Sequence, residues 1–436
     1  MTTIRLLLSI AATYNWHIHQ LDINTAFLHG DLEEELYMKP PPGMKLSANL
    51  VCKLKKSIYG LKHASRQWNH KLTSSLTTLG FLQSKSDYSL FTKYTPTCFT
   101  VILVYIDDLI VAGTNLSDIS HIKHTLDKQF SIKDMGVLKY FLGFEIAHSS
   151  QGITLCQRKY CLDLLQDTGL LASKPASTPI EPGLNLDDKD EALLPDPSLF
   201  RSIIGKLLYL THSRPDIMFS VCRSSQYLAK PTSTHLQAAH RIVRYLKNAP
   251  AKGLFFRRHS NLQLTGFSDS DWGACPTSRR SITGFCFFLG DNIISWKTKK
   301  QTVVSRSSSE AEYRALANTT CEAQWLLFLL HDFRIPHPSP VTLYCDNQSA
   351  IQIANCPIFH ERTKHIEMDC HLVRDKIQDH TVHLMPINSA NQVANVFTKY
   401  LHLGPFSSCI SKLGLLDIHS SLRGGVGLQK PTGHSP

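Results

Sequence analysis

The chain lacks paired cysteines at metal-binding spacing, and it lacks any long apolar run. Its 12 cysteines form no Cys-x-x-Cys pair, which argues against a zinc ribbon or a thioredoxin-like redox motif. Scattered cysteines of this kind are typical of reduced thiols in an intracellular protein. No apolar run reaches the ~18–20 residues of a transmembrane helix. We therefore expect an intracellular protein without a membrane partner.

Acidic residues are also outnumbered. The chain has 46 Lys and Arg against 35 Asp and Glu, a net charge of +11. This balance favours a polyanionic partner, although basicity alone does not separate DNA, RNA and an anionic membrane. The 436 residues suffice for two or three domains with sizeable cores. Residues 5–12 superficially resemble a signal peptide, but Trp16 and His17 offer no clear processing context.

The most informative stretch is a largely apolar run that is interrupted by two adjacent acids. Residues 99–106 lead into Asp107 and Asp108, and residues 109–112 lead out to Gly113. The pattern predicts two buried strands joined by a tight turn. Asp is common at turns because its side chain satisfies nearby backbone N–H groups. The alternative, half of a divalent-metal site, requires a third carboxylate from another strand.

Asp22 can supply that third carboxylate. Residues 16–23 alternate apolar and polar side chains, which is the period of a half-buried strand. Asp22, Asp107 and Asp108 could then converge on two Mg²⁺ ions, or Mn²⁺ in their place, because hard cations prefer oxygen ligands. Two metals ~3.5–4 Å apart suit in-line displacement at phosphorus.

Three motifs, in order, resemble the reverse transcriptase of copia-type LTR retrotransposons. They are Leu21-Asp-Ile-Asn-Thr-Ala-Phe-Leu-His-Gly30, Ser57-Ile-Tyr-Gly-Leu-Lys-His-Ala-Ser-Arg-Gln-Trp68 and Tyr105-Ile-Asp-Asp108. The resemblance covers residues 1 to about 401. It implies that Asp22 and Asp107 are metal ligands, that Asp108 is the third palm carboxylate, and that Phe27 is an aromatic gate against a ribose 2′-hydroxyl.

The resemblance also implies further contacts with the substrates. The residues concerned are Lys62, His63, Arg66, Tyr105, Tyr140 and Gly143. The first three lie near the start of a helix predicted over 62–79, where N–H groups and the helix dipole favour phosphate. The family usually has Gln at the position of His63. Without the motif, Arg66 would be a surface cation. Residues 140–143 are similar to the primer grip, and without that similarity they would be part of a buried aromatic strand predicted over 139–146.

A second set of acids follows from residue 254 onward. Asp269 ends one predicted strand, Glu312 lies in a helix that opens at Ser307, and Asp346 ends another strand. This order resembles a ribonuclease H fold, and residues 279–281, 364–366 and 397–399 match its copia-type form. The resemblance implies that Asp269, Glu312 and Asp346 hold two Mg²⁺ ions that activate water against RNA. Glu310 and Asp271 remain alternatives for two of these roles.

Asn395 departs from the family pattern. The family has Ala-Asp before Phe-Thr-Lys, where this chain has Ala394-Asn395. Asn can coordinate through its carbonyl oxygen but brings no negative charge, so this weak fourth ligand should lower metal affinity or water activation. His360, His365 and His371 could suggest zinc, but their spacing favours surface histidines.

The fold class predicted is α/β (α+β), with a truncated palm and thumb followed by a ribonuclease H-like domain. The expected segments are a palm over 1–172, with the family's upstream fingers largely missing, an exposed Pro-rich linker over 173–197, and a helical thumb or connection over 198–253. A ribonuclease H-like domain over 254–401 and a disordered tail over 402–436 complete them. Three helices are expected over 198–210, 216–228 and 235–246. Arg241, Arg244 and Lys247 would share a face of the last one, turned to nucleic acid or to solvent.

The resemblance implies an RNA-directed DNA polymerase with ribonuclease H activity, in a truncated copy with impaired catalysis. The alternatives are a nucleic-acid-binding relic without catalysis and an assembly module. Expected partners are an RNA template, a DNA primer, an RNA–DNA hybrid, dNTPs, and a second copy or other Pol and Gag products. The expected location is a cytoplasmic virus-like particle or the nucleus, and Met1 could be an internal residue of a longer reading frame.

Overall fold

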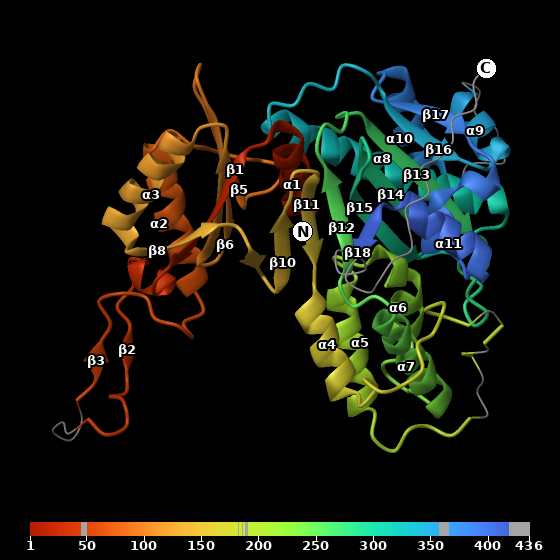
Figure 1. Ribbon diagram of the computed structural model, residues 1–436, viewed down its shortest axis with the longest axis horizontal. Coiled ribbons are helices and arrows are strands. Elements are labelled where there is room, and N and C mark those ends of the chain that lie inside the picture. The colour runs from red at the N-terminus through yellow and green to blue at the C-terminus, as the bar shows by residue number, and fades with distance from the viewer. Residues whose placement is uncertain (45–49, 182, 185, 188–190, 357–365, 418–436) are drawn as a thin grey trace.

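The computed structural model describes residues 1–44, 50–181, 183–184, 186–187, 191–356 and 366–417 (Figure 1). It confirms the predicted mixed α/β class. Within these residues, three sheets of five or six strands form, together with one two-stranded ribbon. In the described part of the chain, we find no helix with the length and apolarity that a bilayer crossing requires.

The first sheet is antiparallel, with strand order β4-β5-β6-β7-β1-β8. Its strands are β1 (His17–Ile23), β4 (Leu82–Gln83), β5 (Leu90–Tyr94), β6 (Phe99–Tyr105), β7 (Asp108–Gly113) and β8 (Ile132–Val137). Ile102 and Val111 pack with helices α2 (Ala64–Thr78) and α3 (Leu116–Phe130) on one face. Val101 and Ile110 join the core that contains α1 (Thr2–Tyr14). Because both faces are covered, the run is apolar without alternation.

A narrow ribbon of β2 (Tyr37–Met38) and β3 (Cys52–Lys53) projects away from this sheet (Figure 1). Glu35 pairs with Lys53 across it, and Asp31 forms ion pairs with Lys56 and Lys71 near its base. The ribbon is held by ion pairs between exposed side chains. Because exposed ion pairs contribute little to stability, they stabilise the ribbon only weakly.

The second sheet joins distant parts of the chain, in the order β18-β12-β11-β10-β9. Its strands are β9 (Tyr140–Phe141), β10 (Phe144–His148), β11 (Gly152–Cys156), β12 (Lys252–Arg257) and β18 (Leu415–Asp417). β12, assigned from sequence to the ribonuclease H-like domain, pairs with β11, which was assigned from sequence to the palm. The prediction of a disordered tail from 402 is wrong for α11 (Leu403–Lys412) and β18. Leu413 and Ile410 are buried there, which gives the segment its order. Residues 418–436 of that prediction lie outside the described residues.

Four helices pack below the second sheet (Figure 1). They are α4 (Arg158–Asp167), α5 (Ser198–Leu210), α6 (Met218–Ser225) and α7 (Ser233–Lys247). The last three confirm the helices predicted for the connection region. The prediction of an exposed linker is wrong for Ala176, Thr178 and Ile180, which are buried.

The basic face of α7 explains why the linker packs. Arg241 donates to Thr178 Oγ1 at 3.2 Å and forms a 3.1 Å ion pair with Glu181. Lys247 donates to the backbone oxygen of Ser173. Two of the three cations predicted to meet nucleic acid or solvent therefore hold the linker.

The third sheet has the order β15-β14-β13-β16-β17. Its strands are β13 (Leu264–Asp271), β14 (Ile282–Leu289), β15 (Asn292–Lys300), β16 (Val341–Cys345) and β17 (Val382–Pro386), and helices α8 (Ser308–Asp332), α9 (Gln348–Asn355) and α10 (Glu367–Gln378) accompany it. β13 runs parallel to β16, and β16 runs parallel to β17. The carboxyl ends of parallel neighbours lie at one edge of a sheet, so Asp269 and Asp346 emerge together.

The first and third sheets are connected by specific contacts. Ser84 donates to Asp332 at 2.6 Å, and Trp325 Nε1 donates to the backbone oxygen of Ser86 at 3.0 Å. The buried guanidinium of Arg5 on α1 lies 3.7 Å from the ring centroid of Trp296 on β15. These contacts place both carboxylate clusters on one connected scaffold.

Candidate active sites

The first carboxylate cluster is built on the tight turn between β6 and β7. Tyr105 pairs with Asp108, which leaves Ile106 and Asp107 as a two-residue loop. Ile106 has a φ of 57°, the sign that primed hairpin turns require at the first loop position. A β-branched residue is strained there. Trp68 Nε1 on α2 holds the turn by donating to the Ile106 oxygen at 2.8 Å.

The structure brings Asp22 to this turn. Asp22 on β1 lies directly opposite Asp108 on β7, and the N–H of Ile23 donates to the Asp107 oxygen at 2.9 Å. Directly opposed residues of an antiparallel pair project from the same face. Burial raises the pKa of Asp108, a hydrogen bond from Gln20 at 3.1 Å opposes this, and the charges of Asp107 and Asp22 raise it further. Asp22 and Asp108 on their paired strands, with Asp107 in the turn, offer half-buried carboxylate oxygens, the ligand type that hard divalent cations prefer. In the described part of the chain, these three side chains are not a group whose ligand atoms all lie within 4.8 Å of one another.

Phe27 lies in η1 (Ala26–His29), the turn that follows β1. Its ring centroid is 4.6 Å from that of Tyr59, with the planes at 52°. Tyr59 is more than half exposed, so the pair forms an accessible aromatic wall. Sequence reasoning singled out neither Tyr59 nor Gln20, although Tyr59 lies inside the second motif.

The cations predicted to meet phosphate lie at the start of α2. Lys62 is exposed, and His63 is the N-cap residue but makes no capping hydrogen bond. His63 and Arg66 line a cavity of about 350 Å³ with Glu33 and Glu34. None of the three aspartates lines that cavity. The structure therefore brings His63 and Arg66 next to an acidic loop.

The segment predicted as one primer-grip strand is a tight hairpin of β9 and β10. Leu142 and Gly143 form its two-residue turn, with φ of 48° and 75°, as a type I′ turn requires. Tyr209 on α5 donates to the Leu142 oxygen. Tyr105 and Leu142 line one cavity of about 440 Å³, so this turn lies close to the turn between β6 and β7. Tyr140 is exposed beside it.

Gly143→Ala is expected to lower the free energy of unfolding by about 2 kcal/mol. A Cβ there would meet Tyr209 Oη at 2.8 Å in addition to the positive φ. Gly136→Ala is the matched control, because Gly136 has a φ of 74° and nothing within 4 Å of the added Cβ. Urea unfolding of both variants measures the free energies of unfolding. An equal decrease for both variants would show that Tyr209 moves aside without cost and that the added Cβ causes no clash.

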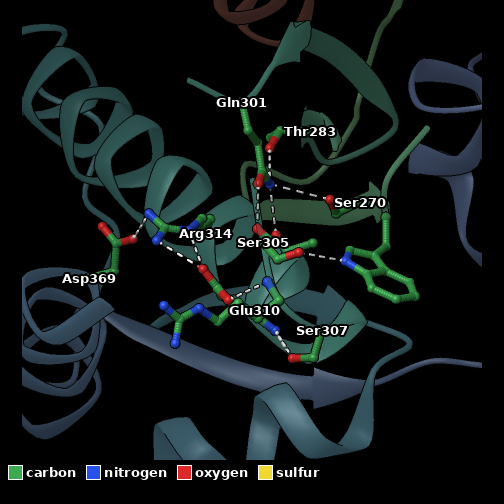
Figure 2. Close-up of polar contacts among 11 residues, drawn as sticks. Ser270, Thr283, Gln301, Ser305, Ser307, Glu310, Arg314 and Asp369 are labelled. Atoms are coloured by element: carbon green, nitrogen blue, oxygen red, sulfur yellow. Dashed lines mark hydrogen bonds and ion pairs between the residues drawn. The ribbon is translucent and has the colours of Figure 1, made fainter. Parts of the chain in front are cut away.

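The second cluster is built where α8 begins. Ser307 caps the helix by accepting from the Glu310 N–H at 3.2 Å, and Glu310 forms a 3.0 Å ion pair with Arg314 (Figure 2). Glu310 also accepts from the Arg306 N–H at 2.7 Å. Glu312 instead accepts from the Ser270 N–H of β13 at 3.1 Å. The structure therefore gives Glu310 to the helix start and Glu312 to the cluster.

Glu312, Cys345 and Asp346 offer ligand atoms that all lie within 4.8 Å of one another. Burial, with the charges of Asp269 and Asp346 added, raises the pKa of Glu312 to about 9. Asp269 is almost fully buried, and burial raises its pKa against the opposing charge of Lys399. Asp269 follows Phe267 by two residues and Asp346 follows Tyr344 by two, and these two aromatic residues are paired on parallel strands, which places Asp269 next to Asp346.

Asp269 is held by residues from the C-terminal part of the domain. Thr398 donates to it, and Lys399 Nζ lies 3.6 Å from its carboxylate. Asp271, the alternative, lines a cavity with Arg223 and Tyr400. Sequence reasoning quoted residues 397–399 as a motif but assigned Thr398 and Lys399 no role.

Asn395 lies in η5 (Val393–Phe397) and is largely buried. Its amide donates to the Ser389 oxygen at 3.0 Å, and Ser389 Oγ donates to Asp346 at 2.6 Å. Its Oδ1 is buried without a partner. Buried acceptors are rarely left unpaired, so this oxygen and the carboxylates together fit a divalent cation. Among the described residues, the metal-capable cluster contains no histidine. His360 and His365 lie outside the described residues.

Comparisons with known proteins identify the family of the chain. Residues 1–182 match the family described as Reverse transcriptase (RNA-dependent DNA polymerase). The Retrovirus-related Pol polyprotein from transposon RE1 of Arabidopsis thaliana is 40% identical over 422 residues, which cover 96% of this chain and 29% of that protein. The one from transposon TNT 1-94 of Nicotiana tabacum is 35% identical, covering 95% of this chain and 32% of that protein.

A shorter relative matches from end to end. The putative transposon Ty5-1 protein of Saccharomyces cerevisiae is 33% identical over 307 residues, which cover 69% of this chain and 100% of that protein. The chain spans about three tenths of the length of the two plant polyproteins. Since the similarity runs through nearly all of its residues, the chain belongs to the copia-type retrotransposon Pol polyproteins, and its first 182 residues belong to their reverse transcriptase region.

Proposed function

We propose that the chain is a reverse transcriptase joined to a ribonuclease H. At the first site, an RNA template directs the addition of dNTPs to a DNA primer. The primer 3′-hydroxyl attacks the α-phosphorus, and pyrophosphate leaves. The observation that carries this proposal is the pairing of Asp22 with Asp108 beside Asp107. These carboxylates would hold two Mg²⁺ ions, or Mn²⁺, which stabilise the attacking and leaving oxygens when bound.

Other residues of the chain would position the substrates at the first site. Gln20 donates a hydrogen bond to the Asp108 carboxylate, and the paired rings of Phe27 and Tyr59 would limit the space beside the sugar. Tyr105, with Tyr140 and Gly143 of the hairpin turn, would place the primer end. The nucleotide phosphates would be bound by Lys62, His63 and Arg66. Glu33 and Glu34 would compete with the phosphates for these side chains.

At the second site, water would attack a phosphodiester of RNA in an RNA–DNA hybrid. Asp269, Glu312 and Asp346 would hold the metal ions. Thr398 and the Ser270 N–H fix two of these carboxylates by hydrogen bonds. Lys399 supplies a positive charge beside Asp269, which favours its ionised form.

The test is Mg²⁺-dependent primer extension on an RNA template, run beside cleavage of the RNA strand of a hybrid by the same preparation. We expect both activities, each abolished by EDTA. Salt-sensitive hybrid binding without either reaction would contradict the proposal and favour a relic that only binds nucleic acid.

A specific observation favours weakened catalysis at the second site. Asn395 offers a neutral oxygen where the resemblance places an acid, so the metals would be held with one negative charge fewer. We therefore propose that hybrid cleavage is impaired relative to polymerisation.

Asn395→Asp is expected to raise hybrid cleavage at about 1 mM Mg²⁺ by roughly tenfold, because a carboxylate binds Mg²⁺ more strongly than an amide oxygen. Asn388→Asp is the matched control, since it adds the same charge at an exposed position that caps η4 (Ser389–Asn391). Cleavage rates measured across a Mg²⁺ titration decide this. An equal effect of both changes, or none, would remove Asn395 from the ligand set.

A further inference from the structure

A separate cavity of about 660 Å³ lies on the third sheet, beside the C-terminal end of α11. None of the four residues of the second cluster, Asp269, Glu312, Asp346 and Asn395, lines it. Phe267 and Tyr344 do line it, and each precedes a cluster aspartate by two residues. Side chains two apart on a strand share a face and lie roughly 7 Å apart along it. The cavity therefore adjoins the carboxylate cluster.

The floor of this cavity is aromatic. Phe267 and Tyr344 are paired in register on parallel strands, and their rings stack with centroids 5.1 Å apart and planes at 25°. Phe288 on β14 meets Phe267 edge-on, with centroids 5.8 Å apart. Phe267 and Tyr344 are only partly buried. A planar ring entering the cavity can extend this stack.

The rim of the cavity is polar and carries two exposed cations. Lys412, at the end of α11, is positioned by Asn391, whose Oδ1 accepts from its amine at 3.0 Å. Arg257 lies at the end of β12, where its N–H donates to Asn292 Oδ1 at 2.7 Å. Asp291 is the one acid among the lining residues. The rim therefore offers two positive charges and a single acceptor carboxylate.

We propose that this cavity binds a nucleotide unit. The base would stack on the aromatic floor, as bases do on aromatic side chains in single-strand-binding proteins. Arg257 and Lys412 would hold the phosphate, and Asp291 would accept a hydrogen bond from a ribose hydroxyl. The unit is either a free nucleoside monophosphate or an unpaired nucleotide of a strand. The binding of either ligand does not depend on catalysis at the carboxylate clusters.

The test is isothermal titration calorimetry of the full chain in EDTA, with four probes. AMP and single-stranded hexaadenylate distinguish the free nucleotide from a nucleotide within a strand. Adenosine and ribose 5-phosphate each lack one recognised part. We expect AMP, hexaadenylate or both to bind with a Kd below about 1 mM. Adenosine and ribose 5-phosphate should bind at least about tenfold more weakly.

Variants separate this cavity from general basicity. Arg257→Ala combined with Lys412→Ala should weaken binding at least about tenfold. Lys297→Ala combined with Lys299→Ala, which removes two exposed charges from β15, should leave it unchanged. Tyr344→Leu should weaken AMP binding and spare ribose 5-phosphate. The proposal is overturned if neither AMP nor hexaadenylate binds, or if the two double variants behave alike. Calorimetry in EDTA does not depend on the activity assays. The nucleotide-binding proposal and the proposed function can therefore be refuted separately.

Discussion

Asp107→Asn is expected to lower primer extension at least about 10³-fold and to leave hybrid cleavage within about twofold of the unchanged chain. Asp107 lies in the turn next to Asp108, which pairs with Asp22. The change therefore removes a charge from the proposed metal-binding set. The amide keeps the size of the side chain, and the backbone bond from Ile23 to Asp107 is unaffected. The loss should therefore lie in catalysis and not in folding. Steady-state extension of a primer on an RNA template measures it.

Asp269→Asn is the reciprocal variant, with hybrid cleavage lost and primer extension kept. The two aspartates lie on different sheets, β6–β7 and β13, which have separate helices against them. Asp163→Asn, an exposed change on α4, is the matched control for the Asp-to-Asn substitution. If either active-site variant loses both activities while its circular dichroism is unchanged, the two sites are not chemically separate.

Local sequence patterns predicted most of the first cluster. The apolar runs around Asp107 and Asp108 indicated the hairpin, and the alternation before Asp22 indicated its strand. Their register was not predictable from composition, because pairing Asp22 with Asp108 depends on strands that lie more than 80 residues apart. The motif resemblance supplied this contact, and the structure agrees with it.

Long-range pairing also explains the errors. The sequence of β12 indicates the start of a new domain, because predicted helices precede it and predicted strands follow it. In the structure, however, β12 pairs with β11, which lies about 100 residues earlier in the chain. Proline content indicated an exposed linker, but Ile180 is buried and Arg241 of α7 binds Glu181. In each case a partner remote in sequence decided the outcome over local composition.

Glu312→Gln is expected to stabilise the metal-free protein at pH 8 by a few kcal/mol. Burial beside Asp269 and Asp346 raises the pKa of Glu312 from its ordinary 4.5 to about 9. Between these values the folded state holds a proton that the unfolded state has released. The free energy of unfolding therefore falls as pH rises through this window, and it levels off above about pH 9. Gln imitates the protonated acid and can keep the hydrogen bond from the Ser270 N–H.

Mg²⁺ should narrow this difference in stability. Bound metal favours the ionised carboxylate and stabilises the folded chain by about 2.7 kcal/mol at 100 times its Kd, whereas Glu312→Gln should gain little. Glu310→Gln is the control, because it breaks the ion pair with Arg314 and should destabilise the chain with or without metal. Urea unfolding from pH 5 to 9, in EDTA and in Mg²⁺, measures all three. A parallel pH dependence for Glu312→Gln and the unchanged chain would remove Glu312 from the cluster, and with it the ribonuclease H assignment.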